Sequence, residues 1–157
     1  MIDPVLALKW VHILSSTVLF GTGLGTALQL VLAHRSGDVR AIAVVTRNVV
    51  RADWLCTLPA GLVQPLSGVA LVLAAGWDPH APWLMAAYGL YALAGLCWAA
   101  VVVLQLRMAR LAARAAQDGA PLPPAYFALY RAWFALGWPA FVGLVIVFAL
   151  MVFKPGW

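Results

Sequence analysis

The sequence lacks glutamate entirely, and its acidic residues are five aspartates. Charged residues of both signs make up only 10% of the 157 residues, whereas a soluble domain of this size carries about 25%. Hydrophobic residues make up 65% of the chain. Because so few charges cannot cover a soluble domain, the composition predicts a single-domain integral membrane protein in a lipid bilayer.

Several kinds of functional group are also missing. The sequence contains no nucleophile–base triad, no phosphate-binding glycine loop and no paired catalytic carboxylates, which excludes hydrolysis and phosphoryl transfer. Cys56 and Cys97 both lie in apolar segments without CxxC spacing, so we expect small buried hydrophobes rather than a disulfide or metal site. The net charge of +5 does not predict nucleic-acid binding, because the arginines stand at the ends of apolar runs.

What is present is a set of long apolar runs. A membrane-spanning helix needs roughly 20 apolar residues, and short links make successive helices antiparallel. The sequence therefore predicts an all-α, integral membrane four-helix up-down bundle. The opening residues have neither a basic region nor a cleavage site, so we expect the first run to be retained as a span. The predicted spans are 5–33, 54–76, 82–106 and 125–153, with an amphipathic cytoplasmic lead-in at 38–53.

The basic residues predict an orientation. Seven arginines lie in the first and third connections, and none lies in the turn at 76–82. Cytoplasmic loops carry an excess of Lys and Arg, so those two connections are predicted to be cytoplasmic and both termini to face outward. The expected location is the bacterial inner (plasma) membrane, which the chain crosses several times.

His12 is the residue that a lipid environment explains least, because an ionisable side chain within a span usually faces the bundle interior and marks a site. Three interpretations remain open. Its imidazole could join helices, with Ser15 and Ser16 close by; it could be an axial haem ligand; or it could relay protons or ions. His34 stands 22 residues away, about 33 Å along a helix, so the two histidines cannot share an iron.

Two residues on the outward side are further candidates for binding a haem. His80, in the turn DPHAP, lies on the same side of the membrane as His12 and is either a simple turn residue or a second ligand. Lys9 can extend to the headgroups, or serve as a ligand or a propionate partner.

A group of charged residues is expected near the cytoplasmic boundary. Arg51, Asp53 and Arg131 are predicted to form a charge-paired cluster, which Gln105 and Arg107 could join. Such a cluster is expected to serve topology, or otherwise to bind an anionic head group. Arg51 and Arg131 are, together with His12, His80 and Lys9, the candidate residues for binding the cofactor.

The second span is interrupted by Pro59 and Pro65, each of which removes a backbone donor. With Gln64, Ser67 and Gly68 they form a polar, kinked segment, which either lines a cavity or is a packing kink.

The first span also contains the pair Gly21 and Gly25. A GxxxG pair lets two membrane helices approach closely, so this side of the span is expected to touch a neighbouring helix.

Short motifs occur in order along the whole chain: Lys9–Trp10–Val11–His12, Phe20–Gly21, His34–Arg35, Arg51 with Pro59 and Gly68, Trp83–Leu84, and Arg131 with Pro139 and Lys154–Pro155. These motifs resemble those of HemJ-type protoporphyrinogen oxidases. The segments FALMVFKP and WLMAAYGLYALAGLCW more closely resemble a bacterial family of predicted four-helix integral membrane proteins whose function is uncharacterised.

The HemJ resemblance implies haem b bound in a small helical bundle, with His12 as the ligand of the iron, and oxidation of a porphyrinogen. Ala87 and Gly137 stand where that family carries a lysine and an acidic residue, so the resemblance implies haem binding more than the oxidase activity. The expected function is a redox or electron-transfer role, with a homo-oligomer or a membrane redox partner. The alternatives are a non-catalytic membrane subunit or assembly factor with a structural His12, and a small transporter.

Overall fold

The computed structural model describes residues 3–156, and it is all-helical across them. Four of its continuous helices are long and apolar enough to cross a membrane, and the second of these, Val39–Ala74, is built from three elements. The fold class predicted from the sequence is confirmed. The elements are α1 (Pro4–Ser36), α2 (Val39–Ala52), the π-helical turn η1 (Asp53–Thr57), α3 (Leu58–Ala74), α4 (Pro82–Asp118) and α5 (Pro124–Phe153).

Local chemistry fixes the ends of the helices. The Asp3 carboxylate accepts a hydrogen bond from the Val5 backbone at 2.9 Å and caps α1, and Asp38 caps α2 through Arg40 at 2.8 Å. Gly37, between these two helices, has a φ of 68°, which ends α1 in a left-handed conformation that glycine adopts without a steric cost. The capped two-residue link turns the chain back on itself.

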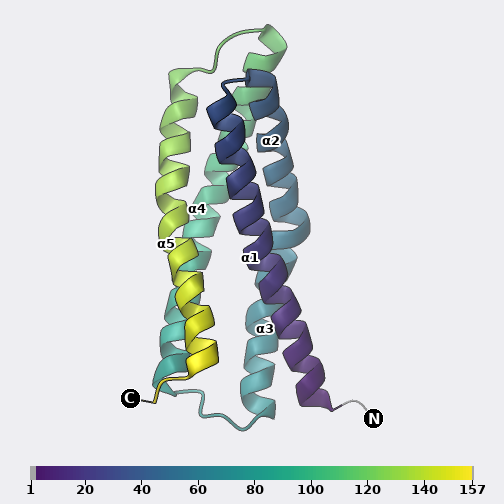
Figure 1. The fold of residues 1–157 in the computed structure, drawn as a ribbon, viewed down its shortest axis with the longest axis vertical. Coiled ribbons are helices and arrows are strands. Elements are labelled where there is room, and N and C mark those ends of the chain that lie inside the picture. The colour runs from purple at the N-terminus through teal and green to yellow at the C-terminus, as the bar shows by residue number, and fades with distance from the viewer. Residues whose placement is uncertain (1–2, 157) are drawn as a thin grey trace.

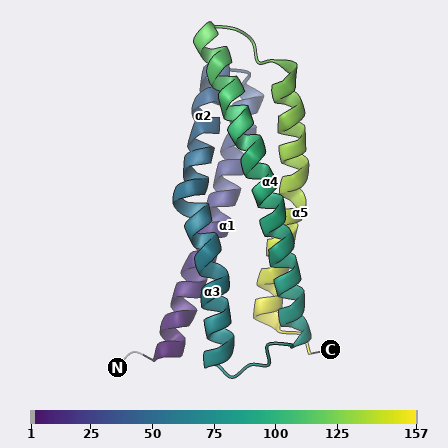
Figure 2. The same cartoon turned by 180° about the vertical axis from the view of Figure 1, so that it is seen from behind.

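The helices run up and down, and both termini lie at the same end of the molecule (Figure 1). The opposite end carries the link from α1 to α2 and the link from α4 to α5 (Figure 2). We call these the terminal end and the arginine end, because seven arginines lie toward the latter, at the end of α1, on α2 and on the last turns of α4. α1 packs on α3, α5 packs on α4, and α2 packs on both α4 and α1.

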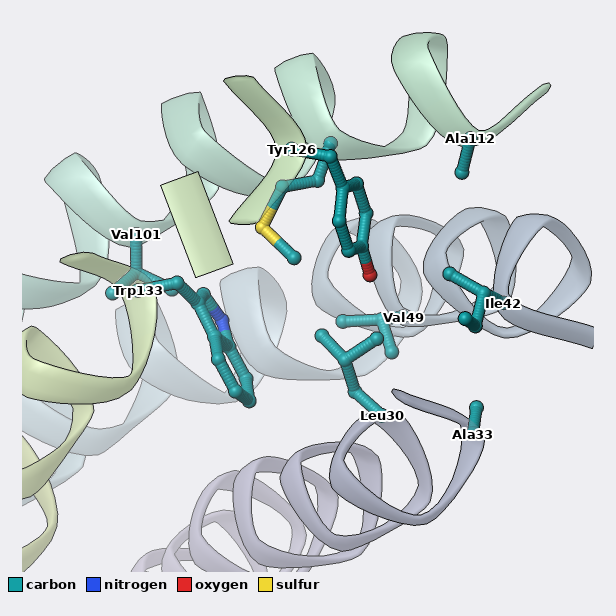
Figure 3. Close-up of a cluster of buried hydrophobic side chains, with 9 residues drawn as sticks. Leu30, Ala33, Ile42, Val49, Val101, Ala112, Tyr126 and Trp133 are labelled. Carbon is teal, nitrogen blue, oxygen red and sulfur yellow. The ribbon is translucent and has the colours of Figure 1, made fainter. Parts of the chain in front are cut away.

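The main core lies toward the arginine end, where four helices converge (Figure 3). Tyr126 of α5 and Met108 of α4 are fully buried between Leu30 of α1 and Ile42 of α2. Trp133 of α5 extends the same cluster. A smaller cluster around Trp83, Leu84 and Leu150 joins α4 to α5 at the terminal end.

The segment interpreted as an amphipathic lead-in to the second span lies in α2. Ile42, Thr46 and Val49 of α2 are buried, three and four residues apart, while Arg40 and Arg47 are exposed. α2 runs through η1 directly into α3.

The third predicted span is longer than expected. α4 continues to Asp118 because its last turns are also amphipathic: Met108, Ala112 and Ala115 are buried while Arg107, Arg110 and Arg114 are exposed. The arginines that we assigned to a connection therefore lie on a helix that packs against α2 and α5.

Candidate functional site

His12 is half-buried, and its ring is directed toward α3 rather than out of the bundle. Nδ1 lies 2.9 Å from Oγ of Ser67, and Nε2 lies 3.1 Å from Nε2 of Gln64. Both ring nitrogens are thus in hydrogen bonds to side chains of a single neighbouring helix.

The directions of these hydrogen bonds follow from the groups involved. The Gln64 amide nitrogen can only donate, so Nε2 of His12 accepts, and Nδ1–H donates to the Ser67 hydroxyl. The Ser67 hydroxyl in turn donates to the Val63 carbonyl at 2.7 Å, and the Ser15 hydroxyl donates to Oε1 of Gln64. A neutral imidazole with its proton on Nδ1 therefore satisfies the whole network.

Local sequence places these groups on one side of α3. Gln64, Ser67 and Gly68 are three and four residues apart, which puts them on the same helix face. A Cβ atom at Gly68 would lie 3.1 Å from Cε1 of His12, so glycine allows the ring to approach the α3 backbone. Of the two expected serine partners, Ser15 joins the network, whereas Ser16 donates to Ile13 of its own helix.

The predicted charge-paired cluster around Asp53 is wrong. Asp53 is only 5% exposed, whereas Arg51 and Arg131 are exposed, and within residues 3–156 no basic side chain forms an ion pair with Asp53. The reason is the π-helical turn, which begins at Asp53 and directs its carboxyl toward α4. There it lies beside Trp98 and Gln105.

The chain matches the model of one known protein family. The model of a family described as "Predicted integral membrane protein (DUF2269)" covers residues 6–155. The chain belongs to this family. No curated protein matches the chain, and no solved structure matches it. The resemblance to a family of predicted integral membrane proteins is therefore confirmed, and the description of that family assigns it no activity.

In this DUF2269 protein, the five residues proposed to bind a cofactor do not form one site. His80 lies in the turn between α3 and α4, with its side chain 86% exposed beside Asp78, and Lys9 is exposed on α1. Arg51 and Arg131 are exposed, and each lies in the first half of a continuous helix that begins at the arginine end. His12 is the one candidate whose side chain is held by a network.

The residues around His12 do not fit a haem as they stand. An iron ligand needs a free ring nitrogen, and the two nitrogens of His12 already bind Gln64 and Ser67. Within residues 3–156 no group of three or more His, Cys, Asp or Glu side chains could hold a metal ion. Haem binding would require the Gln64 amide to move away from Nε2.

His34, near the end of α1, is packed in an aromatic stack. Its ring lies 3.7 Å from that of Tyr130, nearly parallel to it, and 6.0 Å from that of Tyr126. These contacts pack the end of α1 against the start of α5. Because the two helices are far apart in the sequence, residue spacing within one helix cannot predict such a contact.

The glycine pair of α1 does not mark a helix contact within the chain. Gly21 and Gly25 are exposed, and a Cβ atom at either would have nothing within 4 Å. The face of α1 that approaches α3 is the one with Ser15 and His12.

Two grooves flank the arginine-bearing part of α4. One, of about 660 Å³, lies between α2 and α4, and the other, of about 630 Å³, lies between α4 and α5. Both combine alanines and leucines with arginines. The arginines are Arg40, Arg47, Arg51 and Arg110 in the first groove and Arg107, Arg110 and Arg114 in the second.

Proposed function

We propose that this chain is a non-catalytic membrane subunit or assembly factor, in which His12 joins α1 to α3. The observation that carries the proposal is the use of both imidazole nitrogens by Gln64 and Ser67. A histidine that ligates iron needs a nitrogen free for the metal. Here the ring has no such nitrogen.

Such a network suits a structural role in lipid. Apolar tails do not drive two membrane helices together, so hydrogen bonds between their side chains help to hold them. Each contributes about 0.6 kcal/mol on average in a bilayer protein. The Ser67 and Gln64 contacts also fix the register of α1 against α3, because both partners of His12 must be in place at once.

The proposed location is the bacterial inner membrane, with the arginine end in the cytoplasm and both termini outward. The seven arginines toward the arginine end support this orientation, since the turn between α3 and α4 carries none. Lys154, at the terminal end, lies 3.9 Å above the ring of Trp77, a cation–π pair suited to the headgroup level.

A second candidate is a haem b protein with a redox role, including a HemJ-like oxidation of a porphyrinogen. One contact favours it: metal-binding histidines almost always donate their other ring nitrogen to an oxygen, as Nδ1 of His12 does to Ser67. Haem would supply the one-electron chemistry. The role of this chain would be to orient His12 through Ser67 and to release Nε2 from Gln64.

The absorption spectrum of protein purified in detergent, after expression with ample haem, distinguishes the two candidates. Gln64→Ala frees Nε2 of His12, while His12→Ala removes the ring, and His80→Ala alters an exposed histidine as the control. For a structural His12 we expect colourless preparations throughout. The first two variants should be less heat-stable than wild type, and the control should be unchanged.

A Soret band in wild type that His12→Ala abolishes and Gln64→Ala preserves would overturn the structural role. Adding porphyrinogen to such a coloured preparation and following porphyrin fluorescence would then test the oxidase activity.

A further inference from the structure

A second polar site lies between η1 and α4, and three of its side chains are almost completely buried. Asp53, Thr57 and Gln105 are 5%, 6% and 6% exposed, and the half-buried Trp98 lies beside them; we call these four residues the Asp53 cluster. The side chains of Thr57, Trp98 and Gln105 lie near the Asp53 carboxyl, but four buried atoms of the cluster make no hydrogen bond of good geometry. They are Oδ2 of Asp53, Oγ1 of Thr57, Nε1 of Trp98 and Oε1 of Gln105.

The π-helical turn creates this cluster. In η1 the chain takes one wide turn, which places Asp53 and Thr57 at its two ends. Such turns are rare, and they frequently lie at functional sites. On α4, Trp98 and Gln105 are seven residues apart, or two helical turns. Both side chains therefore lie on the same face of α4, the face toward η1.

The cluster is deep in the molecule but close to one membrane boundary. Asp53 stands 21 residues before the last residue of α3, about 30 Å along the helix, which is the thickness of the hydrocarbon core. Asp53 therefore lies near the inner limit of that core on the side of the arginine end, within the bundle.

No positive charge neutralises Asp53. Arg47 and Arg51 on α2 and Arg107 on α4 are exposed, and no described residue forms an ion pair with this carboxyl. α1 has no charged or titratable residue between His12 and His34, and α3 has none at all. The titratable groups of α4 before Arg107 are Tyr88, Tyr91 and Cys97, and α5 contributes Tyr126, Tyr130 and Arg131.

We propose that the Asp53 cluster is a proton-binding site, in which Asp53 carries one proton and one water molecule bridges the four unpartnered atoms. An isolated carboxylate in a low-dielectric interior is costly and is neutralised instead of remaining charged. The proton comes from water at the arginine end and binds a carboxylate oxygen. The net charge of the site changes from −1 to zero.

The four unpartnered atoms match a water molecule. Trp98 N–H and the O–H of the protonated Asp53 can donate hydrogen bonds to its oxygen, while Gln105 Oε1 and Thr57 Oγ1 can accept its two hydrogens. Buried waters typically make about three such bonds to otherwise unsatisfied groups. A sodium ion fits less well, because the Trp98 N–H would direct its positive end at the cation.

Infrared difference spectroscopy of the full chain in lipid vesicles tests the proposal. A protonated carboxyl has a C=O stretch that is separate from the bands of a carboxylate. We expect this band at neutral pH in wild type and its loss in Asp53→Asn, which keeps the size and neutrality of the acid. Asp38→Asn, which alters an exposed helix cap with a residue that caps equally well, should leave the band unchanged.

A second variant, which keeps the Asp53 carboxyl, allows the test to be made even if Asp53→Asn does not fold. Trp98→Phe removes one donor, so the C=O band should shift in frequency but persist. Exchange of water for H₂¹⁸O should shift a band of the bridging water in wild type. The proposal is overturned if the Asp53 bands are those of a carboxylate at neutral pH, or if sodium but not potassium raises the Tm of wild type and not of Asp53→Asn.

Discussion

Single residues decide how closely α1 approaches α3. The ring of His12 lies against Gly68, where even a Cβ atom would be 3.1 Å from Cε1. Hydrogen bonds to Ser67 and Gln64 fix the orientation of the same ring. A glycine and a histidine on separate helices are thus complementary in shape, in addition to the hydrogen bonds.

Replacing Gly68 with valine should therefore push the His12 ring away from α3 and break its hydrogen bonds. Overpacking of this kind lowers the free energy of unfolding by about 1–3 kcal/mol. Thermal unfolding in detergent, followed by circular dichroism, measures the loss. Gly21→Val is the matched control, because a side chain there meets nothing within 4 Å. Equal Tm values for the two variants would contradict the close packing of His12.

The aromatic stack at the other end of α1 makes a second residue-scale contact. His34 lies 3.7 Å from Tyr130, ring centre to ring centre, with an interplanar angle of 10°. Aromatic pairs contribute about 0.5–1.5 kcal/mol beyond the area that they bury.

His34→Ala should accordingly lower the free energy of unfolding by about 1 kcal/mol, most of it through the contact with Tyr130. A double-mutant cycle with Tyr130→Ala measures the coupling between the two rings. His80→Ala, on an exposed turn, should have no effect on Tm. Additive effects of His34→Ala and Tyr130→Ala would exclude the stack as a source of stability.

At the scale of an element, η1 determines how α2 and α3 are oriented relative to each other. A π-helical turn holds one more residue than the corresponding α-helical turn. The extra residue lets α2 face α4 while α3 directs Gln64 and Ser67 toward α1. A regular helix of the same length would rotate one of these faces by about 100°.

Deleting Leu55, an exposed residue of η1, should convert the turn to a regular α-helix and leave both faces in place. Deleting Leu62, an exposed residue within α3, should instead rotate the residues on one side of the deletion by about 100° and separate Gln64 from His12. We expect a Tm close to wild type for the first deletion and a Tm roughly 5–10 °C lower for the second. Equal destabilisation by the two deletions would argue against this role for η1.

At the scale of the whole molecule, both termini and the turn between α3 and α4 lie at one end, and the α1–α2 and α4–α5 links lie at the other (Figures 1 and 2). Asp78 and Asp118 are exposed residues that stand near opposite ends of the bundle. They are suitable positions at which to test the proposed orientation.

In a background without Cys56 and Cys97, a membrane-impermeant maleimide should label Asp78→Cys in cells whose outer membrane is permeable. Asp118→Cys should react only after the inner membrane is opened. Gel-shift detection of the labelled protein gives the result for each site. The reverse pattern would place the termini in the cytoplasm and contradict the proposed topology.

The sequence by itself determined that the chain is a four-span helical membrane protein, because hydrophobic run length and the amphipathic spacing of α2 are properties of local sequence. It also indicated that His12 needs a polar partner. Only the tertiary structure identified Gln64 and Ser67 as those partners and turned Asp53 away from the arginines toward α4. The partners of His12 and the direction of the Asp53 side chain both depend on how one helix is rotated about its axis relative to another. Packing between helices and the π-helical turn determine that rotation, and the residue pattern of a single helix does not.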